Sequence, residues 1–269
     1  MTGTNVANTA TFDEQQKFLL RTLTALDRKL CAYFGRASLV GDREFFDEQD
    51  FPWVKAIEAD WRKIRAELDT LLPYLSHMPN FQDIQKGVAE SLTQGDDWKT
   101  FFFYAYGVKS VGNCRRCPET SKVLRQIPGM KTAFFSILAP GKHIPPHRGL
   151  YKGVLRLHLG LVIPEPTDMC AIRVGSQTRH WQEGRVMIFD DVFEHEAWNR
   201  TDGVRVVLFV DIMRPMGFLA NMLNSVITRG IALSPLVLGA LNNHRRWEKR
   251  FEAITNQGDR QSADLVRSL

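Results

Sequence analysis

The chain has 269 residues, which is long for one average domain and short for two large ones, so we expect one compact domain with additions. Its composition is 44% hydrophobic and 24% charged, with 19 Gly and 12 Pro, which excludes a collagen, a disordered tail protein and a disulfide-rich miniprotein. The net charge of +5 is too small to indicate nucleic-acid binding, and we expect no nucleic-acid partner.

The segments that bear on location are the first residues and one apolar stretch. The opening MTGTNVANTATFDEQQ contains neither a basic region nor an apolar run of the kind that directs export, so we expect a cytoplasmic protein with its four cysteines reduced. The stretch from Phe218 to Leu241 is about long enough to span a bilayer, but Asn221, Arg229 and Pro235 interrupt it. We interpret it as a helix pair that is soluble or lies on the surface of the inner membrane.

Residues 1–97 are expected to form an N-terminal helical region that packs on the core. Leucines at 19, 23, 26 and 30 recur at helical spacing, and apolar residues between Trp53 and Leu71 repeat the pattern more clearly. Pro52 suits the first turn of the second helix. The intervening GDREFFDEQDF is predicted to be a polar loop, and the segment after Pro73 a loop with one short helix.

Residues 98–215 carry a different pattern, of short β-rich runs separated by Gly and Pro. The runs are TFFFYAYG, TAFFSILAPG, GVLRLHLGLVIP, MCAIRVG, GRVMIFDD and GVRVVLFVDI, and they predict a strand-rich domain of the sandwich or barrel kind. Residues 216–269 return to helical composition and form a C-terminal helical segment and tail.

Alternation along two of these strands places basic side chains on one face. In GVLRLHLGLVIP the leucines share one side, which leaves Arg156 and His158 on the other. In GVRVVLFVDI the same count puts Arg205 on one face with Phe209 and Asp211. A surface strand also shows polar residues on one face, but two arginines and a histidine among apolar neighbours suit a barrel that holds a small dicarboxylate.

Three histidines lie in loops near these strands: His143, His147 and His195. The prolines between the first two forbid the helix that a zinc-protease pair requires. His147 and His195 are instead separated by strands, as in barrel metal sites in which each half supplies one ligand. A carboxylate two residues after His147 would complete the commonest non-haem iron site, but position 149 is Gly. From the residues alone, a metal site and solvated or hydrogen-bonding histidines both remain open.

The stretches PPHRG, LRLHLGLVIP, IFDDVFEHEAWN and RVVLFVDI occur in an order that resembles the aspartyl/asparaginyl β-hydroxylase family of iron(II)- and 2-oxoglutarate-dependent dioxygenases, including its bacterial lipid A hydroxylase-like branch. The resemblance covers about residues 98–215. It implies a mainly β fold with flanking helices around a double-stranded β-helix, related to jelly rolls and cupins.

The resemblance also implies the site. His147 and His195 would be the two iron ligands, and Gly149 would mark the position without a carboxylate. Arg156 and His158 would contact the 1-carboxylate end of 2-oxoglutarate, and Arg205, helped by Ser136, would hold its 5-carboxylate. His147, His195 and Arg156 would then be the catalytic set, with O2 as the second cosubstrate.

The substrate is less closely indicated. The leading prediction is hydroxylation of an unactivated carbon, the β-carbon of an Asp/Asn-type peptide or protein substrate. The alternative is a lipid A acyl chain at the membrane surface, which the C-terminal segment SPLVLGALNNHRRWEKRFEA favours with its basic cluster. The helix predicted at residues 12–34 is too charged to be the membrane span with which lipid A hydroxylases typically begin. A non-catalytic metal-binding cupin-like barrel is the candidate of another class.

Two smaller motifs are interpreted as structural or left open. Asp190 and Asp191 either orient His195 or cap a turn. Cys114 and Cys117 form a CxxC pair, but no second pair with zinc-site spacing follows, so we expect a structural loop that leads to a helix.

Overall fold

The computed structural model describes residues 28–85, 90, 92–149 and 151–267, with side chains described as far as Thr255. The leucines predicted to begin the first helix, at positions 19, 23 and 26, lie outside these residues. Residues 28–37, which include Leu30, are helical.

The N-terminal region differs from its prediction in two places. It contains β1 (Phe45–Phe46), η1 (Glu48–Asp50), α2 (Val54–Ala59), α3 (Trp61–Leu71), η2 (Leu72–His77) and α4 (Phe81–Ile84). The loop predicted around Phe45 and Phe46 was wrong in part, because both rings are buried and their backbone extends the edge of a sheet. The helix predicted from Trp53 to Leu71 is two helices, with a break at Asp60.

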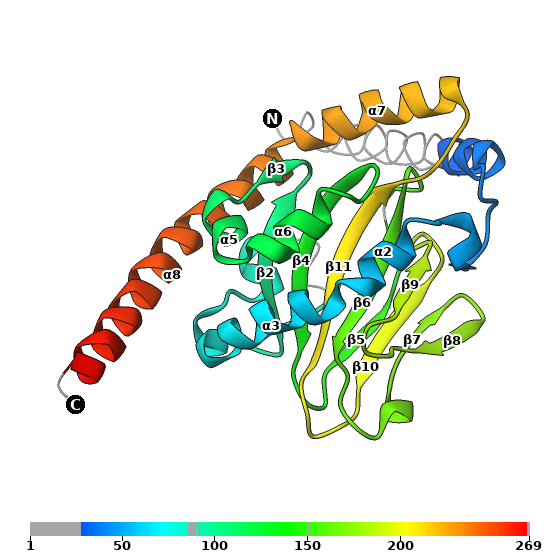
Figure 1. Ribbon diagram of the computed structural model, residues 1–269. Helices are drawn as coiled ribbons and strands as arrows, with labels where there is room; N and C mark the ends of the chain where they lie inside the picture. Colours follow the sequence, from blue (N-terminus) through cyan, green and yellow to red (C-terminus); the bar gives the residue numbers. More distant parts are fainter. Residues whose placement is uncertain (1–27, 86–89, 91, 150, 268–269) are drawn as a thin grey trace, which may run out of the picture.

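Two antiparallel sheets form the core of the protein (Figure 1). The strands are β2 (Trp98–Ala105), β3 (Val108–Lys109), β4 (Met130–Leu138), β5 (His143–His147), β6 (Val154–Val162), β7 (Cys170–Val174), β8 (Gln177–His180), β9 (Val186–Phe189), β10 (His195–Asn199) and β11 (Arg205–Met213). The large sheet has the order β1-β9-β6-β11-β4-β2-β3, and the small sheet has the order β5-β10-β7-β8. From β4 to β11 the chain passes back and forth between the sheets, which confirms the double-stranded β-helix with flanking helices.

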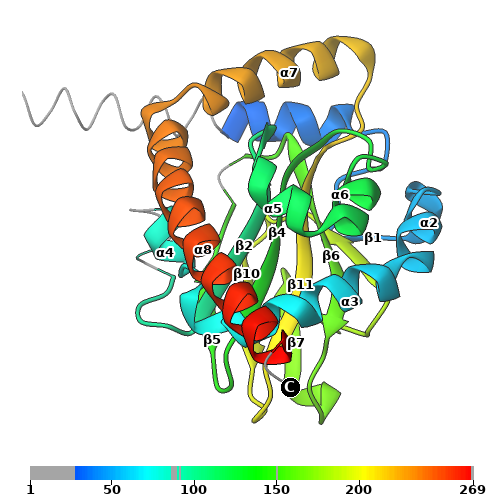
Figure 2. The same ribbon diagram turned by 60° about the vertical axis from the view of Figure 1, so that its left-hand side comes forward.

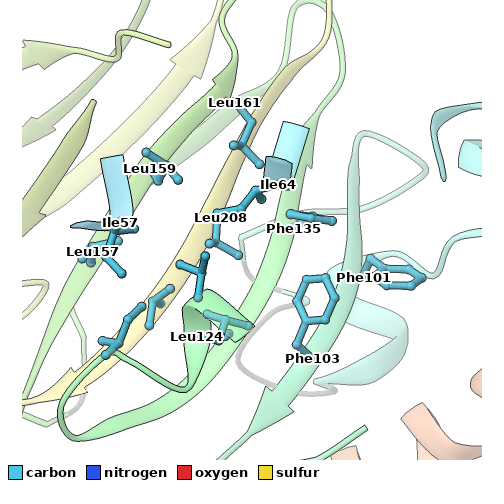
Figure 3. Close-up of a cluster of buried hydrophobic side chains, with 14 of the residues drawn as sticks. Ile57, Ile64, Phe101, Phe103, Leu124, Phe135, Leu157, Leu159, Leu161 and Leu208 are labelled. Carbon is cyan, nitrogen blue, oxygen red and sulfur yellow. The ribbon is translucent and has the colours of Figure 1, made fainter. Parts of the chain in front are cut away.

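The outer face of the large sheet carries the main hydrophobic core. Leu157, Leu159 and Leu161 of β6 lie beside Leu208 of β11, as their alternation predicts, and they pack under the helices (Figure 3). α2 and α3 supply Ile57 and Ile64, and α6 (Pro118–Leu124) supplies Leu124. The inner face therefore remains for the polar side chains.

Two long helices complete the fold. α7 (Phe218–Ala232) runs beside the helix of residues 28–37 in both views, with Phe34 and Ala220 in one buried cluster (Figures 1 and 2). α8 (Pro235–Arg267) crosses the β2 side of the sheet, where Trp247 and Phe251 contact Phe101. Within the described residues, no one helix has the length and apolarity to cross a bilayer. α7 and the first part of α8 satisfy those criteria only as a pair, bent by 57°.

Candidate functional site

His147 and His195 meet at the edge of the small sheet. His147 ends β5 and His195 begins β10, and the two are directly paired in register with their ring centroids 4.0 Å apart. The segment HIPPH was predicted as a loop, and this was wrong. It forms an edge strand, where Pro145 and Pro146 remove no hydrogen bond that the sheet needs. The register between β5 and β10 shifts just before His147, where β5 carries one residue more than β10, as in a β-bulge.

Both histidines have the tautomer and the charge state that a metal ligand requires. The Nδ1 atoms of His147 and His195 lie 2.8 Å from the carbonyl oxygen of Pro145 and 3.0 Å from that of Phe193. A carbonyl only accepts, so each Nδ1 carries the proton and each Nε2 keeps a lone pair. Burial lowers the pKa of His147, and it lowers the pKa of His195 to about 3, so both rings are neutral at pH 7. The described residues contain no group of three or more His, Cys, Asp or Glu suited to a metal.

Gly149 lies against a carboxylate of another segment. A Cβ atom built on Gly149 would lie 2.3 Å from Oδ2 of Asp191, and the Gly149 amide donates to the Asp191 carbonyl oxygen at 2.7 Å. Oδ1 of Asp191 is buried without a hydrogen-bond partner in the described part of the chain. Gly149 itself carries no carboxylate, but the fold places the carboxylate of Asp191 directly beside it.

Arg156 is held between two acids. Its Nη2 lies 2.9 Å from Oδ2 of Asp191, its Nε lies 3.0 Å from Oδ1 of Asp211, and its guanidinium lies over the ring of Phe209. Burial raises the pKa of Asp211, and the neighbouring Asp191 charge adds to that effect while Arg156 opposes it. Arg156 is thus fixed at the cavity wall by two carboxylates that the sequence pattern does not predict as its partners.

Arg205 is buried without a carboxylate. Its side chain is 1% exposed, and no acid among the described residues lies within ion-pair distance of it. Its Nη1 donates weakly to the Ser136 backbone oxygen at 3.3 Å, its Nε has no partner there, and Trp181 covers the guanidinium. Burial lowers its pKa to about 10, so it stays charged at pH 7. An unpaired buried cation of this kind is suited to an anionic ligand.

His158 lies between Arg205 and the histidine pair. Its Nδ1 accepts a hydrogen bond from Nε1 of Trp181 at 3.3 Å, so Nε2 carries the proton, and that atom is buried with no partner in the described structure. Burial lowers the pKa of His158 well below its usual range, and the nearby charges of Arg205 and Arg156 lower it further. His158 therefore offers an unpartnered N–H donor, and Arg205 an unpartnered Nε, to an anionic ligand.

A cavity of about 240 Å³ opens onto His147, Arg156 and Asp191. Its floor is a row of stacked rings, with Phe209 4.3 Å from Phe134 and Phe134 4.4 Å from Phe102. Its remaining wall is mostly apolar and comes from the β2 side of the large sheet, α4, α7 and α8, and includes Ile84, Leu92, Val154, Ile231 and Ala240. An apolar ligand group would contact more of this lining than a polar one would.

His244 of α8 lies at the Phe102 end of this cavity. Both of its ring nitrogens are buried and have no hydrogen-bond partner in the residues described, and burial lowers its pKa. In the sequence, His244 is recognisable only as part of a basic helical segment. The signal was weak, because a single histidine in HRRW does not show which face it takes.

Replacing His244 with Phe is expected to reduce the sensitivity of folding to acid. Below about pH 6.5 an unfolded histidine takes up a proton, whereas folded His244 has a lowered pKa and does not. Stability is therefore lost as the pH falls from about 6.5 toward the folded pKa, by up to about 1 kcal/mol per pH unit. Thermal unfolding at pH 7.5 and pH 5 should show a smaller drop in His244→Phe than in the wild type. Equal drops in unfolding temperature would contradict the conclusion that folded His244 has a lowered pKa.

The two adjacent acids differ, and Asp190 matches the predicted turn cap. Asp190 is fully buried, pairs with Arg214 and lies 3.3 Å from Nζ of Lys152, so it serves the fold. Its Oδ1 also accepts from the amide of Val192, as a turn cap does. Asp191 instead faces Arg156 and the cavity.

Cys114 and Cys117 are both buried in the main core as free thiols, in α5 (Val111–Arg116) and at the start of α6. Burial raises the pKa of each thiol, which fits the predicted structural role better than a redox role.

Comparison with known proteins places this geometry in a family. The family model described as aspartyl/asparaginyl beta-hydroxylase matches residues 58–215, and so begins before the predicted Trp98 and includes α3. The ornithine lipid ester-linked acyl 2-hydroxylase of Rhizobium tropici is 49% identical over 214 residues, which cover 80% of this chain and 76% of that protein.

Eukaryotic relatives match a shorter part of the chain. The human aspartyl/asparaginyl beta-hydroxylase is 35% identical over 167 residues, which cover 60% of this chain but 21% of the human protein. The mouse aspartate beta-hydroxylase domain-containing protein 2 is 33% identical over 171 residues, 60% of this chain and 48% of that protein. The chain, with its paired histidines and inward-facing arginines, belongs to the aspartyl/asparaginyl β-hydroxylase family of hydroxylases.

Proposed function

We propose that the protein is an iron(II)- and 2-oxoglutarate-dependent hydroxylase that acts on the acyl chain of a lipid. The observation that carries the proposal is the cavity, which joins His147 of the histidine pair to a floor of stacked aromatic rings. The 49% identity with an acyl 2-hydroxylase supports the same substrate class.

The residues present fit the iron and the cosubstrate. His147 and His195 would bind the metal through Nε2, because Nδ1 of each is already used. Arg205 would bind one carboxylate of 2-oxoglutarate, and the N–H of His158 would donate to the other end. Bound iron(II), with 2-oxoglutarate and O2, would supply the oxidising chemistry. The protein's own part is to orient the reactants and to exclude water from the cavity.

The first prediction for the substrate, an Asp/Asn-type side chain, stays a prediction. The cavity favours the acyl chain in one respect, because most of its lining is aromatic and aliphatic, with charged side chains such as Lys131 and Arg148 in the minority. A small polar side chain would leave this surface without contacts, whereas an alkyl chain would bury it, at about 25 cal/mol per Å² of apolar area.

The decisive experiment measures succinate after anaerobic loading with iron(II) and 2-oxoglutarate and admission of O2. We expect an ester-linked acyl lipid to stimulate succinate formation and an Asp/Asn peptide not to do so. Stimulation by the peptide alone would overturn the acyl proposal. Loading without turnover on any substrate would favour the non-catalytic barrel.

A bulky residue at Ala240 should separate the two substrates further. Ala240 of α8 lines the cavity, so Ala240→Trp should fill it and reduce lipid-stimulated succinate by about tenfold or more. Asn242→Trp is the matched control, since Asn242 is exposed on the same helix. An acyl lipid that still stimulates Ala240→Trp fully would show that the chain binds elsewhere.

Supplying the carboxylate that the sequence lacks is expected to harm the site. In Gly149→Asp the new Cβ would lie 2.3 Å from the Asp191 carboxylate, so the side chain cannot enter without displacing it. We expect weaker iron binding, by about tenfold or more, in an anaerobic iron(II) titration. The double variant Gly149→Asp with Asp191→Gly should recover part of the loss. Tighter binding by the single variant would contradict this reading.

A further inference from the structure

An uncovered apolar surface lies on the side of α7 that faces away from the cavity. Phe218 is 82% exposed, Leu219 is 68% exposed and Val226 is 60% exposed, and Met222 and Leu223 complete the same surface. We call these five residues the α7 outer face. Isolated exposed apolar residues are ordinary, but a contiguous set on one helix marks an interaction site. Within the described residues, nothing covers it.

The opposite side of the same helix is anchored over the cavity. Asn224 is buried, accepts a hydrogen bond from the hydroxyl of Tyr151 at 2.5 Å and donates to the Gly153 carbonyl oxygen at 2.7 Å. Thr228 and Ile231 line the cavity itself. One helix thus separates the cavity from the exposed apolar surface, and both views show it at the rim of the molecule (Figures 1 and 2).

The charge around this surface favours a lipid bilayer as its occupant. Residues 212–247 contain no Asp or Glu, but they contain Arg229 at the end of α7 and Arg245 and Arg246 on α8, all three exposed. An apolar helix face in a segment that carries basic and no acidic residues is the pattern of helices that lie in the interface of anionic membranes. A face that paired with a second copy would gain nothing from an excess of like charge.

We propose that the α7 outer face docks on an anionic lipid bilayer and that the acyl chain enters the cavity from beneath this helix. The docking step stands on the exposed face and its charge. The delivery step rests on the proposed function, because it requires the cavity to bind an acyl chain.

Vesicle flotation of the full chain tests the docking step. The variant Leu219→Ser with Val226→Ser removes two residues of the face. Its matched control is Leu39→Ser with Val111→Ser, because Leu39 is 72% exposed and Val111 is 58% exposed outside α7. With vesicles of phosphatidylcholine and phosphatidylglycerol, we expect the wild type and the control to float, and the α7 variant to be recovered at about one tenth of that level or less. Pure phosphatidylcholine or high salt should weaken binding.

Flotation of the α7 variant at the wild-type level, or no flotation of the wild type, would overturn the proposal. Analytical sedimentation without lipid measures the oligomeric state and so tests whether a second copy of the chain covers the α7 outer face. A wild-type dimer that the α7 variant abolishes, without vesicle binding, would assign the face to a second copy. Thermal unfolding of both variants checks that each is folded.

Succinate formation on two substrates then distinguishes delivery of the acyl chain from the bilayer from the hydroxylation step itself. The α7 variant should lose turnover of lipid in vesicles but keep turnover of a short, water-soluble acyl ester. Equal losses on both would overturn delivery from the bilayer. If the wild type turns over neither substrate, the proposed function fails, and flotation still decides the docking step.

Discussion

Replacing Arg205 with Met is expected to abolish 2-oxoglutarate binding without destabilising the protein. The side chain is 1% exposed and has no acid partner in the described residues, so its buried charge costs free energy in the folded protein. Met fills a similar volume without that charge. We expect an unfolding temperature at or above that of the wild type, and a cosubstrate affinity reduced by about 100-fold or more, as the loss of a charged hydrogen-bonded pair implies.

Arg214 is the matched control for this prediction. It is equally buried, but it pairs with buried Asp190 and donates to the Lys152 carbonyl oxygen at 2.7 Å. Arg214→Met would leave Asp190 with Lys152 as its only cation, so we expect a loss of about 3 kcal/mol or more in the free energy of unfolding. Thermal unfolding and calorimetric titration with 2-oxoglutarate measure both effects. A destabilised Arg205→Met that still binds 2-oxoglutarate would show that Arg205 is structural.

The strands that carry the arginines were predictable because their pattern is local. The period of two in β6 and β11 determines which side chains face the helices and which face the small sheet. A register shift of one residue would turn every leucine away from the helices and toward the small sheet. The alternation therefore predicted correctly that Arg156, His158 and Arg205 lie on the face opposite the leucines. The run of turn residues after each strand also marked where the strands end.

The contacts of these side chains were not predictable, because they join segments far apart in the chain. Asp211 stood on the correct face of its strand, but nothing in the sequence shows that it and Asp191 meet at Arg156. The absence of an acid beside Arg205 is equally invisible, since it depends on every segment that surrounds it. β5 was missed for another reason, because proline is compatible with a strand only at an edge, and edges are defined by the whole sheet.

Removing either His147 or His195 is expected to abolish iron(II) binding. Each supplies one neutral nitrogen whose direction is set by its Nδ1 hydrogen bond, and the described residues contain no group of three or more His, Cys, Asp or Glu suited to a metal. A metal held by two protein ligands cannot keep a specific site with one. We expect His147→Ala and His195→Ala each to weaken binding by about 100-fold or more in an anaerobic titration, which exceeds the loss for a residue that only orients a ligand.

His143 provides the control, because it lies on the same strand as His147 and differs in its surroundings. Its side chain is 48% exposed, and its Nε2 lies 2.8 Å from Oε2 of Glu196, on the outer side of the small sheet. His143→Ala should therefore bind iron(II) like the wild type. If all three alanine variants bind equally, the histidine pair is not the metal site. If His143→Ala loses binding as well, the effect comes from β5 as a strand, and the assignment to the pair fails.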